Sequence, residues 1–173
     1  EVIEKVDEKN LSNSISIILE NNEEHKKTNY FLKLCFECRP DFIQCLKPSY
    51  GQFINYFKKN IDTELITLIH KILINNSDSS LFLSSDELHS IAQFMNETEI
   101  DQDSLNLLHL IATKKEFKSM DDFVSIVPDL LITLQIAEDE KKFLSILSLF
   151  EKIMNFNGFV TSIVNCNGQI LLS

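Results

Sequence analysis

A short apolar phrase recurs in this chain at a constant interval of 39 residues. It reads ELITLIHKIL at 64–73, DSLNLLHLIA at 103–112 and KFLSILSLFE at 142–151. Counted from Ile66, Leu105 and Leu144, the positions at offsets 0, 2, 3 and 6 are apolar in all three copies. They form a broad stripe along one side of a helix. A fourth copy places Leu32, Leu34, Cys35 and Cys38 at these positions, 34 residues upstream of the first phrase. Self-similarity at about 40 residues is typical of helical solenoids with two or three helices per unit.

The repeated positions predict the core of the long helices. Side chains that are apolar in every copy should be buried between layers of helices, since a surface helix needs a narrower stripe. Six residues are expected to be buried on this basis: Ile66, Ile69, Leu105, Leu108, Leu144 and Leu147.

A CxxC motif, Cys35 and Cys38, falls on the apolar positions of the fourth copy. Such a motif can be a redox pair or half of a zinc site. A zinc site needs a second pair of cysteines, and Cys45 and Cys166 do not have the spacing of one. A redox motif lies at a strand-to-helix junction, and no strand is expected before 29–38. We expect both cysteines of the motif to be reduced, buried and metal-free, because free cysteine packs as a small hydrophobe.

Between the long phrases the chain carries two shorter helical segments per unit. Short first helices are expected at 39–46, 77–84, 117–125 and 157–164, and second helices at 50–59, 86–96, 127–137 and 168–173. Acidic turns at 60–64, 97–103 and 137–141 precede the long helices, where Asp and Glu can cap free N–H groups. Only 3 Gly and 3 Pro interrupt the 173 residues, which argues against a β-sandwich or barrel.

The order of short, medium and long helix resembles the armadillo repeat. The resemblance runs from about Leu11 to Ser173, as about four units with the first and last incomplete. Gly51 and Gly168 match the small residue that the family often places before the second helix. The resemblance implies an all-α, right-handed α-α superhelix that forms a single domain over 1–173. A HEAT-like or irregular superhelix is the alternative.

Charge and hydropathy exclude several classes of partner. The formal net charge is −10 at pH 7, and Arg39 is the only arginine, whereas nucleic-acid binders cluster Arg and Lys. No apolar stretch reaches the roughly 18 residues that a membrane span needs.

The absence of an initial Met, together with an apolar run at the end, predicts a fragment of a larger protein. Four cysteines without an evident pairing pattern predict a cytoplasmic one.

No catalytic motif is present. The chain lacks GxSxG, HExxH, GxxxxGK[ST] and GxGxxG, and 3 glycines cannot build a phosphate-binding loop. The acidic clusters lack the spacing of an EF-hand. The sequence therefore predicts a non-enzymatic protein with no cofactor and no metal.

In the armadillo family the long third helices line a concave groove that takes peptides or partner domains. The resemblance implies that the groove carries the residues one and four places after offset 0 of each phrase (Ile66, Leu105, Leu144 and, in the fourth copy, Leu32), with others farther along the helices. The partner-binding residues expected in this way are Lys33, Phe36, Thr67, His70, Lys71, Asn106, His109, Ser145, Ser148 and Lys152, with Glu37 and Thr113 beside them.

The class of partner stays open at this point. The chain has no Trp, whereas the importin-α type of groove reads basic signals with Trp and Asn. Other armadillo proteins dock folded partners: diaphanous-type formins bind a Rho-family GTPase and use the region for autoinhibition, and Hsp70 exchange factors embrace an ATPase lobe. A small GTPase, a chaperone or a peptide segment is thus expected, in a regulatory or scaffolding role.

The alternative function is structural, a solenoid segment that mediates self-assembly of a larger chain. Ile170, Leu171 and Leu172 have nothing after them to cover them except Ser173. They predict a homodimer through the C-terminal end, because terminal units of a solenoid need polar caps.

Overall fold

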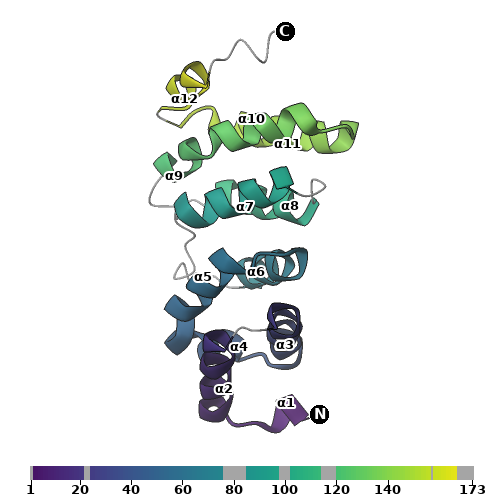
Figure 1. The fold of residues 1–173 in the computed structure, drawn as a ribbon, viewed down its shortest axis with the longest axis vertical. Coiled ribbons are helices and arrows are strands. Elements are labelled where there is room, and N and C mark those ends of the chain that lie inside the picture. Colours follow the sequence, from purple (N-terminus) through teal and green to yellow (C-terminus); the bar gives the residue numbers. More distant parts are fainter. Residues whose placement is uncertain are drawn as a thin grey trace. The chain divides into compact units, whose positions relative to one another are not determined.

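The computed structural model (Figure 1) describes residues 2–21, 24–75, 85–97, 102–113, 120–156 and 158–166. These residues form helices joined by turns and include no β-strand. The prediction of an all-α protein is confirmed. The chain divides into two compact units, Glu1–Ile72 and Leu73–Ser173, and each is described by itself.

Helices joined by short turns make up the first unit. They are α1 (Val2–Lys5), α2 (Glu8–Glu20), α3 (His25–Cys38), α4 (Phe42–Leu46), the 3-10 turn η1 (Lys47–Ser49), α5 (Tyr50–Lys59) and α6 (Thr63–Asn75), which continues into the second unit. Asp7 caps α2 by accepting a hydrogen bond from the backbone N–H of Asn10 at 3.0 Å. Asp62 does the same for α6, accepting from Leu65 at 2.9 Å. The acidic turn before this long helix therefore has the capping role that the sequence predicts.

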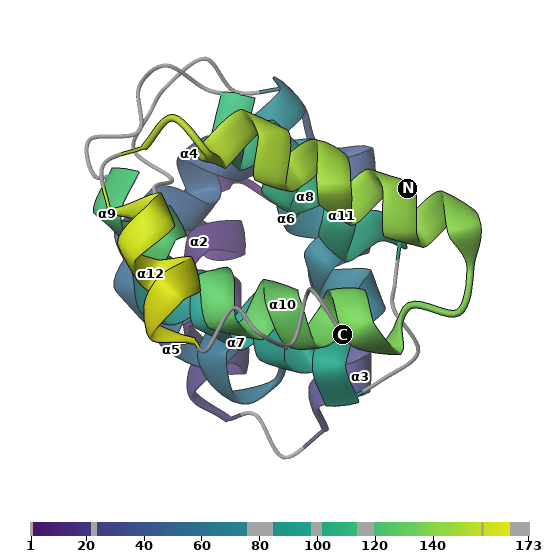
Figure 2. The ribbon, with the colours of Figure 1, turned by 90° about the horizontal axis from the view of Figure 1, so that it is seen from above.

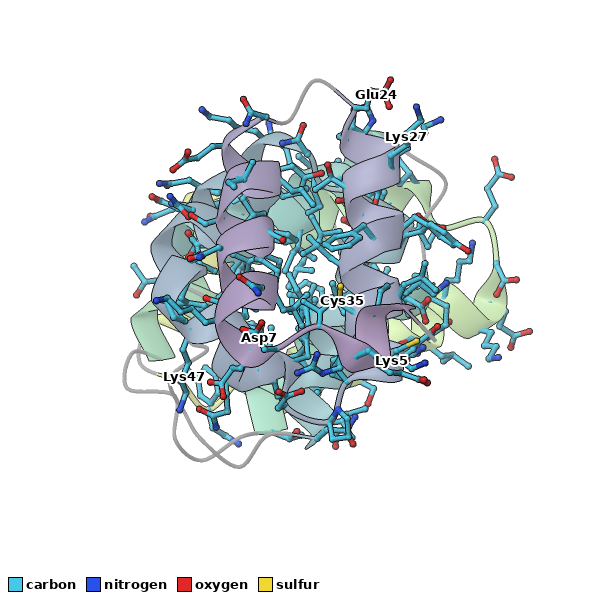
Figure 3. All side chains as sticks on the ribbon, turned by 90° about the horizontal axis from the view of Figure 1, so that it is seen from below. Lys5, Asp7, Glu24, Lys27, Cys35 and Lys47 are labelled. Carbon is cyan, nitrogen blue, oxygen red and sulfur yellow. The ribbon has the colours of Figure 1, made fainter. Side chains whose placement is uncertain are left out.

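The core of the first unit forms around α2, which packs against α3, α4 and α5. One face of α2 buries Leu11, Ile15 and Leu19 at intervals of four residues, as an amphipathic helix does. Figure 3 shows Cys35 on the side of α3 that faces α2, and its side chain is fully buried. Large aromatic rings fill the rest of this core: Phe42, Phe53, Tyr56 and Phe57.

In the second unit, two medium helices pair and two long helices pair. The helices are α7 (Ser85–Glu97), α8 (Gln102–Thr113), α9 (Met120–Ser125), α10 (Val127–Ile136), α11 (Glu140–Ile153) and α12 (Phe159–Asn165). α10 packs against α7, and α11 packs against α8. Figure 2 shows α12 beside α9 and one end of α10, in agreement with their contacts. Asp139 caps α11 by accepting from the N–H of Lys142 at 3.0 Å.

The expected helices are found where the structure describes the chain. The long phrases form α3, α6, α8 and α11, the second helices form α5, α7 and α10, and short helices form at α4, α9 and α12. Two predicted segments, 77–84 and 168–173, lie outside the described residues. Ile170, Leu171 and Leu172 lie there too. Among the helices that are described, none is long and apolar enough to cross a membrane.

The predicted burial of the repeated apolar positions holds in two copies and fails in the third. Ile66, Ile69, Leu105 and Leu108 are at most 2 % exposed, but Leu144 is 55 % and Leu147 40 % exposed. The prediction for the last two was wrong because α11 packs on α8 and α10 with a different stripe of its surface. That stripe is formed by Ile146, Leu149 and Ile153.

The expectation for the CxxC motif also needs a correction. Cys35 is buried, but Cys38 is partly exposed, because it is the last residue of α3. Both cysteines are free.

Equivalent positions in two copies provide a matched test of this packing. Leu108→Ala removes a fully buried side chain, and it should lower the free energy of unfolding by about 2–5 kcal/mol. Leu147→Ala, at the same place in the third phrase, should change it by no more than about 0.5 kcal/mol. Urea denaturation followed by circular dichroism measures both values. Equal losses for the two variants would contradict the burial pattern.

Candidate functional site

The residues predicted to bind a partner lie on the long helices and are grouped within each unit. The first unit holds Lys33 and Phe36 on α3 and Thr67, His70 and Lys71 on α6. The second holds Asn106 and His109 on α8 and Ser145, Ser148 and Lys152 on α11. We call these ten residues the long-helix face. None of them is fully buried, so the apolar stripe does leave this side of the helices accessible.

In the first unit, equivalent positions of α3 and α6 are joined by an ion pair. The Nζ of Lys71 lies 3.4 Å from the Oε1 of Glu37, and both side chains are more than 40 % exposed. The two residues occupy the same offset in their phrases, 34 residues apart. An exposed pair of this kind contributes little to stability, but it shows that the polar sides of these two helices face the same solvent region.

A hollow of about 470 Å³ opens between the starts of α3 and α6. Lys26, Tyr30, Asp62, Thr63 and Glu64 line it. The phenol ring of Tyr30 is largely exposed, at 56 %.

This hollow lies at one end of the long-helix face. Lys26 and Tyr30 precede Lys33 by seven and three residues, spacings that place all three on one side of α3. Thr63 precedes Thr67 by four on α6. The sequence reasoning missed Lys26 and Tyr30 because it counted forward from each apolar phrase. Extending the same helical spacing backward would have found them.

In the second unit, a histidine bridges the two long helices. The Nε2 of His109 lies 2.9 Å from the backbone carbonyl oxygen of Ser145 and 3.3 Å from its Oγ. A carbonyl oxygen only accepts hydrogen bonds, so the Nε2 carries the hydrogen and the neutral ring keeps its lone pair on Nδ1. His109 on α8 and Ser145 on α11 were both predicted for the face, and here they are in direct contact.

The partly buried position of His109 disfavours its protonation. Burial lowers the pKa of the imidazole below its ordinary value, and the positive charge of Lys152 lowers it further, whereas the hydrogen bond to Ser145 acts in the opposite direction. Asn106 is exposed on the same helix and accepts a hydrogen bond from Gln102 at 3.1 Å. Ser148 and Lys152 are exposed on α11.

Phe36 has a structural role as well. Its ring packs edge-on against Phe42 of α4, with ring centroids 5.9 Å apart. The Thr67 hydroxyl donates to the carbonyl of Thr63 one turn earlier, at 2.8 Å. These two face residues are therefore partly occupied by contacts inside the fold, whereas Lys33 and His70 remain half-exposed.

The only arginine has a role that its type did not reveal. Arg39 donates from Nε and Nη2 to the two carboxylate oxygens of Asp41, at 2.7 and 2.6 Å. Its Nη1 donates to the carbonyl oxygens of Ile3, at 3.1 Å, and Val6. The guanidinium thus ties α1 and the turn before α2 to the start of α4. Hydrogen bonding to Arg39 keeps the pKa of the Asp41 carboxyl below its ordinary value.

A buried polar network joins three helices of the first unit. The side-chain amide of Asn29, which is 1 % exposed, donates to Asp62 at 2.6 Å. The Tyr56 hydroxyl donates toward the Asn29 side-chain oxygen, at 2.8 Å, and toward the carbonyl of His25, at 3.0 Å. Burial raises the pKa of Tyr56 to about 12. The network supports the same Asp62 that lines the hollow.

Two thiols of the first unit, those of Cys35 and Cys45, are poor nucleophiles. Burial raises the pKa of Cys35 to about 12, and the neighbouring Cys38 thiol adds to the effect. The pKa of Cys45 is also raised by burial, and its thiol donates to Asp41 across 3.8 Å. In the described part of the chain, no group of three or more His, Cys, Asp or Glu side chains is placed to hold a metal ion.

No protein-family model matches this chain, and neither a curated protein nor a solved structure matches it.

The high pKa of Cys35 makes it unreactive at neutral pH, because the thiolate is the nucleophile. In the native protein at pH 8, Cys35 should resist alkylation, while the partly exposed Cys38 and Cys166 react. Mass spectrometry of peptides after timed alkylation measures each rate, and a denatured sample is the control. Labelling of Cys35 as fast as Cys38 would contradict its burial.

His109 should make stability fall in mild acid. Its pKa is lowered in the folded state, so the unfolded chain binds the proton more readily. The contribution of neutral His109 to stability is fully present above about pH 6.5, the ordinary pKa of histidine. It is lost as the pH falls through the lowered pKa of His109 in the folded protein. His109→Gln keeps a donor for Ser145 and does not titrate, so it should lose stability less steeply between about pH 7 and 5. The control is His25→Gln, at an exposed position, and an unchanged slope in His109→Gln would refute the assignment.

Proposed function

We propose that this chain is a non-enzymatic, armadillo-like protein-binding module whose partner binds along the long-helix face. The partner is a peptide segment or a folded domain such as a small GTPase or a chaperone, and the role is regulatory or scaffolding. A cytoplasmic setting is part of the proposal, supported by the free cysteines at 35, 38, 45 and 166.

The observation that carries the proposal is the hollow between α3 and α6. It has polar walls, the exposed ring of Tyr30 and the flexible amine of Lys26. Tyrosine is enriched where proteins bind one another because its ring offers apolar area and its hydroxyl offers a hydrogen bond. The hollow continues into the row of Lys33, Thr67 and His70, so a partner has both an anchoring point and a surface to follow.

The armadillo-like part of the proposal is supported by the order and the pairing of the helices. Helices of increasing length follow one another at α4, α5 and α6, with 5, 10 and 13 residues, and at α9, α10 and α11, with 6, 10 and 14. In the second unit α10 packs on α7 and α11 packs on α8, so these two helices each lie on the counterpart from the preceding repeat. This nearest-neighbour pairing is what a helical repeat requires.

The second unit contributes the face of α8 and α11. His109 and Ser145 fix these two helices to each other, and Asn106, Ser148 and Lys152 stay exposed around them. A rigid surface with exposed polar side chains suits binding, because little conformational entropy is lost there on association.

The proximity of His109 and Ser145 does not favour catalysis. The Nε2 that faces Ser145 already carries a hydrogen and donates it to the carbonyl, so it cannot accept the proton of the serine hydroxyl. The buried Cys35 stays protonated at neutral pH. Both arrangements favour a binding surface over a nucleophilic site.

The test compares two triple variants of the full chain. His70→Ala, Lys71→Ala and His109→Ala together alter the face, while Lys9→Ala, Lys59→Ala and Gln135→Ala alter exposed positions on the second helices α2, α5 and α10. A protein captured by the wild type is titrated against all three forms. The face variant should bind it at least about tenfold more weakly, and the control should bind as the wild type does.

The stability of both triple variants is measured alongside binding. Surface substitutions and an exposed ion pair contribute up to about 1 kcal/mol each. His109→Ala also removes the hydrogen bond to Ser145, worth about 0.5–1.5 kcal/mol, and both variants should still be folded at 25 °C. Unchanged affinity in a folded face variant, with loss of binding in the control, would move the partner to the opposite side of the helices.

A further inference from the structure

A second exposed stripe runs along α11, separate from the long-helix face. Glu140, Leu144, Leu147 and Glu151 are spaced by four, three and four residues, so they lie in one line along the helix. All four are exposed. We call them the acidic stripe. Two leucines at its centre are flanked at each end by a carboxylate, and the ends are about 16 Å apart along the helix axis.

The neighbouring stripe of α11 has the opposite charge. Lys141, Ser145, Ser148 and Lys152 repeat the same spacing one residue later, which is about 100° around the helix. Three of these four belong to the long-helix face. The helix therefore presents a line that ends in lysines beside a line that ends in glutamates, and only the second one has an apolar centre.

The acidic stripe is an unusual place to expose leucine. Leu144 and Leu147 occupy the phrase positions that Leu105 and Leu108 occupy in α8, where both side chains are fully buried. α8 has α7 and α11 packed against it. On α11 the two leucines are 55 % and 40 % exposed. Because helices pack against α8, we take a helix as the shape of partner that fits the equivalent stripe of α11.

Charge indicates which helix fits. Residues 73–173 hold 15 acidic and 6 basic residues, a net charge of −9, whereas residues 1–72 hold 11 and 10, a net charge of −1. The negative charge of the chain is thus concentrated in the unit that carries the acidic stripe. A positively charged partner is attracted to this unit at long range and meets Glu140 and Glu151 at short range.

We propose that the acidic stripe is a docking site for an amphipathic helix of a basic protein partner. Such a helix places two apolar residues against Leu144 and Leu147. It places Lys or Arg about eleven residues apart against the two glutamates. This site lies on a different side of α11 from the long-helix face, so it does not depend on the function proposed above.

A second copy of the chain is a poor occupant of the same stripe. In antiparallel contact Glu140 of one copy meets Glu151 of the other, and in parallel contact each glutamate meets its own counterpart. Both arrangements bring like charges together around the leucines, between units that are each net negative. The charge that attracts a basic helix therefore opposes pairing of this chain with itself.

The experiment uses two designed helical peptides on the full chain. The basic peptide carries Leu at two positions three residues apart and Lys four residues before the first and after the second. Its acidic twin carries Glu in place of Lys. Fluorescence anisotropy at low salt should show the basic peptide binding at least about tenfold more tightly than the twin, and added salt should reduce the difference.

Variants of the two neighbouring stripes assign the effect. The double variant Glu140→Lys with Glu151→Lys should invert the preference between the peptides. Glu140→Gln with Glu151→Gln, which changes the charge at the start of α11 less, should abolish the preference. Lys141→Glu with Lys152→Glu, one residue along, should leave the basic peptide preferred. Leu144→Asn with Leu147→Asn should weaken the basic peptide about tenfold, whereas Ile17→Asn, at a residue of similar exposure (58 %) on α2, should not.

Two results would overturn the proposal. One is equal binding of the two peptides, or a preference that the glutamate variants do not change. The other is self-association of the full chain, seen by light scattering, that Leu144→Asn with Leu147→Asn removes, because the stripe would then be the contact of a homodimer.

Discussion

The long helices carry apolar stripes that one neighbouring helix cannot cover. In α8, Ser104, Leu105, Leu107, Leu108 and Ile111 are all buried, and they lie on more than one side of the helix. α7 packs against α8, and α11 packs against it as well. A single pair of helices would leave part of this surface in water, at a cost of about 25 cal/mol per Å² of apolar area. A second neighbouring helix is therefore needed to bury the rest of the stripe, and the repeat of the helices supplies it.

Apolar burial is non-directional, so polar contacts between repeats are needed to fix the register. Several join residues about one repeat apart: Asn29 with Asp62, Glu37 with Lys71, His89 with Asp129 and His109 with Ser145. The Nδ1 of His89 lies 2.9 Å from the Asp129 carboxylate and links α7 to α10. His109 links α8 to α11 in the same unit. Each hydrogen bond has a required geometry. These contacts therefore fix the position of one helix along its neighbour, where apolar packing alone would allow several.

The same architecture provides the surfaces proposed for binding. A long helix that is covered on two sides keeps a third side in solvent, and in both units this side carries half-exposed or exposed polar residues. In the first unit it is hollowed beside Tyr30. In α11 a further side is uncovered, and the acidic stripe lies there. Binding at either surface uses side chains that the fold has already fixed on rigid helices, which lowers the entropic cost of association.

The sequence by itself determined the helices and the direction of their apolar stripes. A repeated period and acidic caps such as Asp62 and Asp139 are local properties of the chain, so they could be read before any contact was known. The same spacing also predicted which side of the long helices the apolar stripe leaves accessible. Contacts between distant residues could not be read in this way, because the apolar pattern of α11 is the same whether or not a neighbour covers it. Only the tertiary structure decided that Leu144 and Leu147 stay in solvent, that Tyr30 borders a hollow and that His109 meets Ser145, since each of these depends on which helix packs on which side.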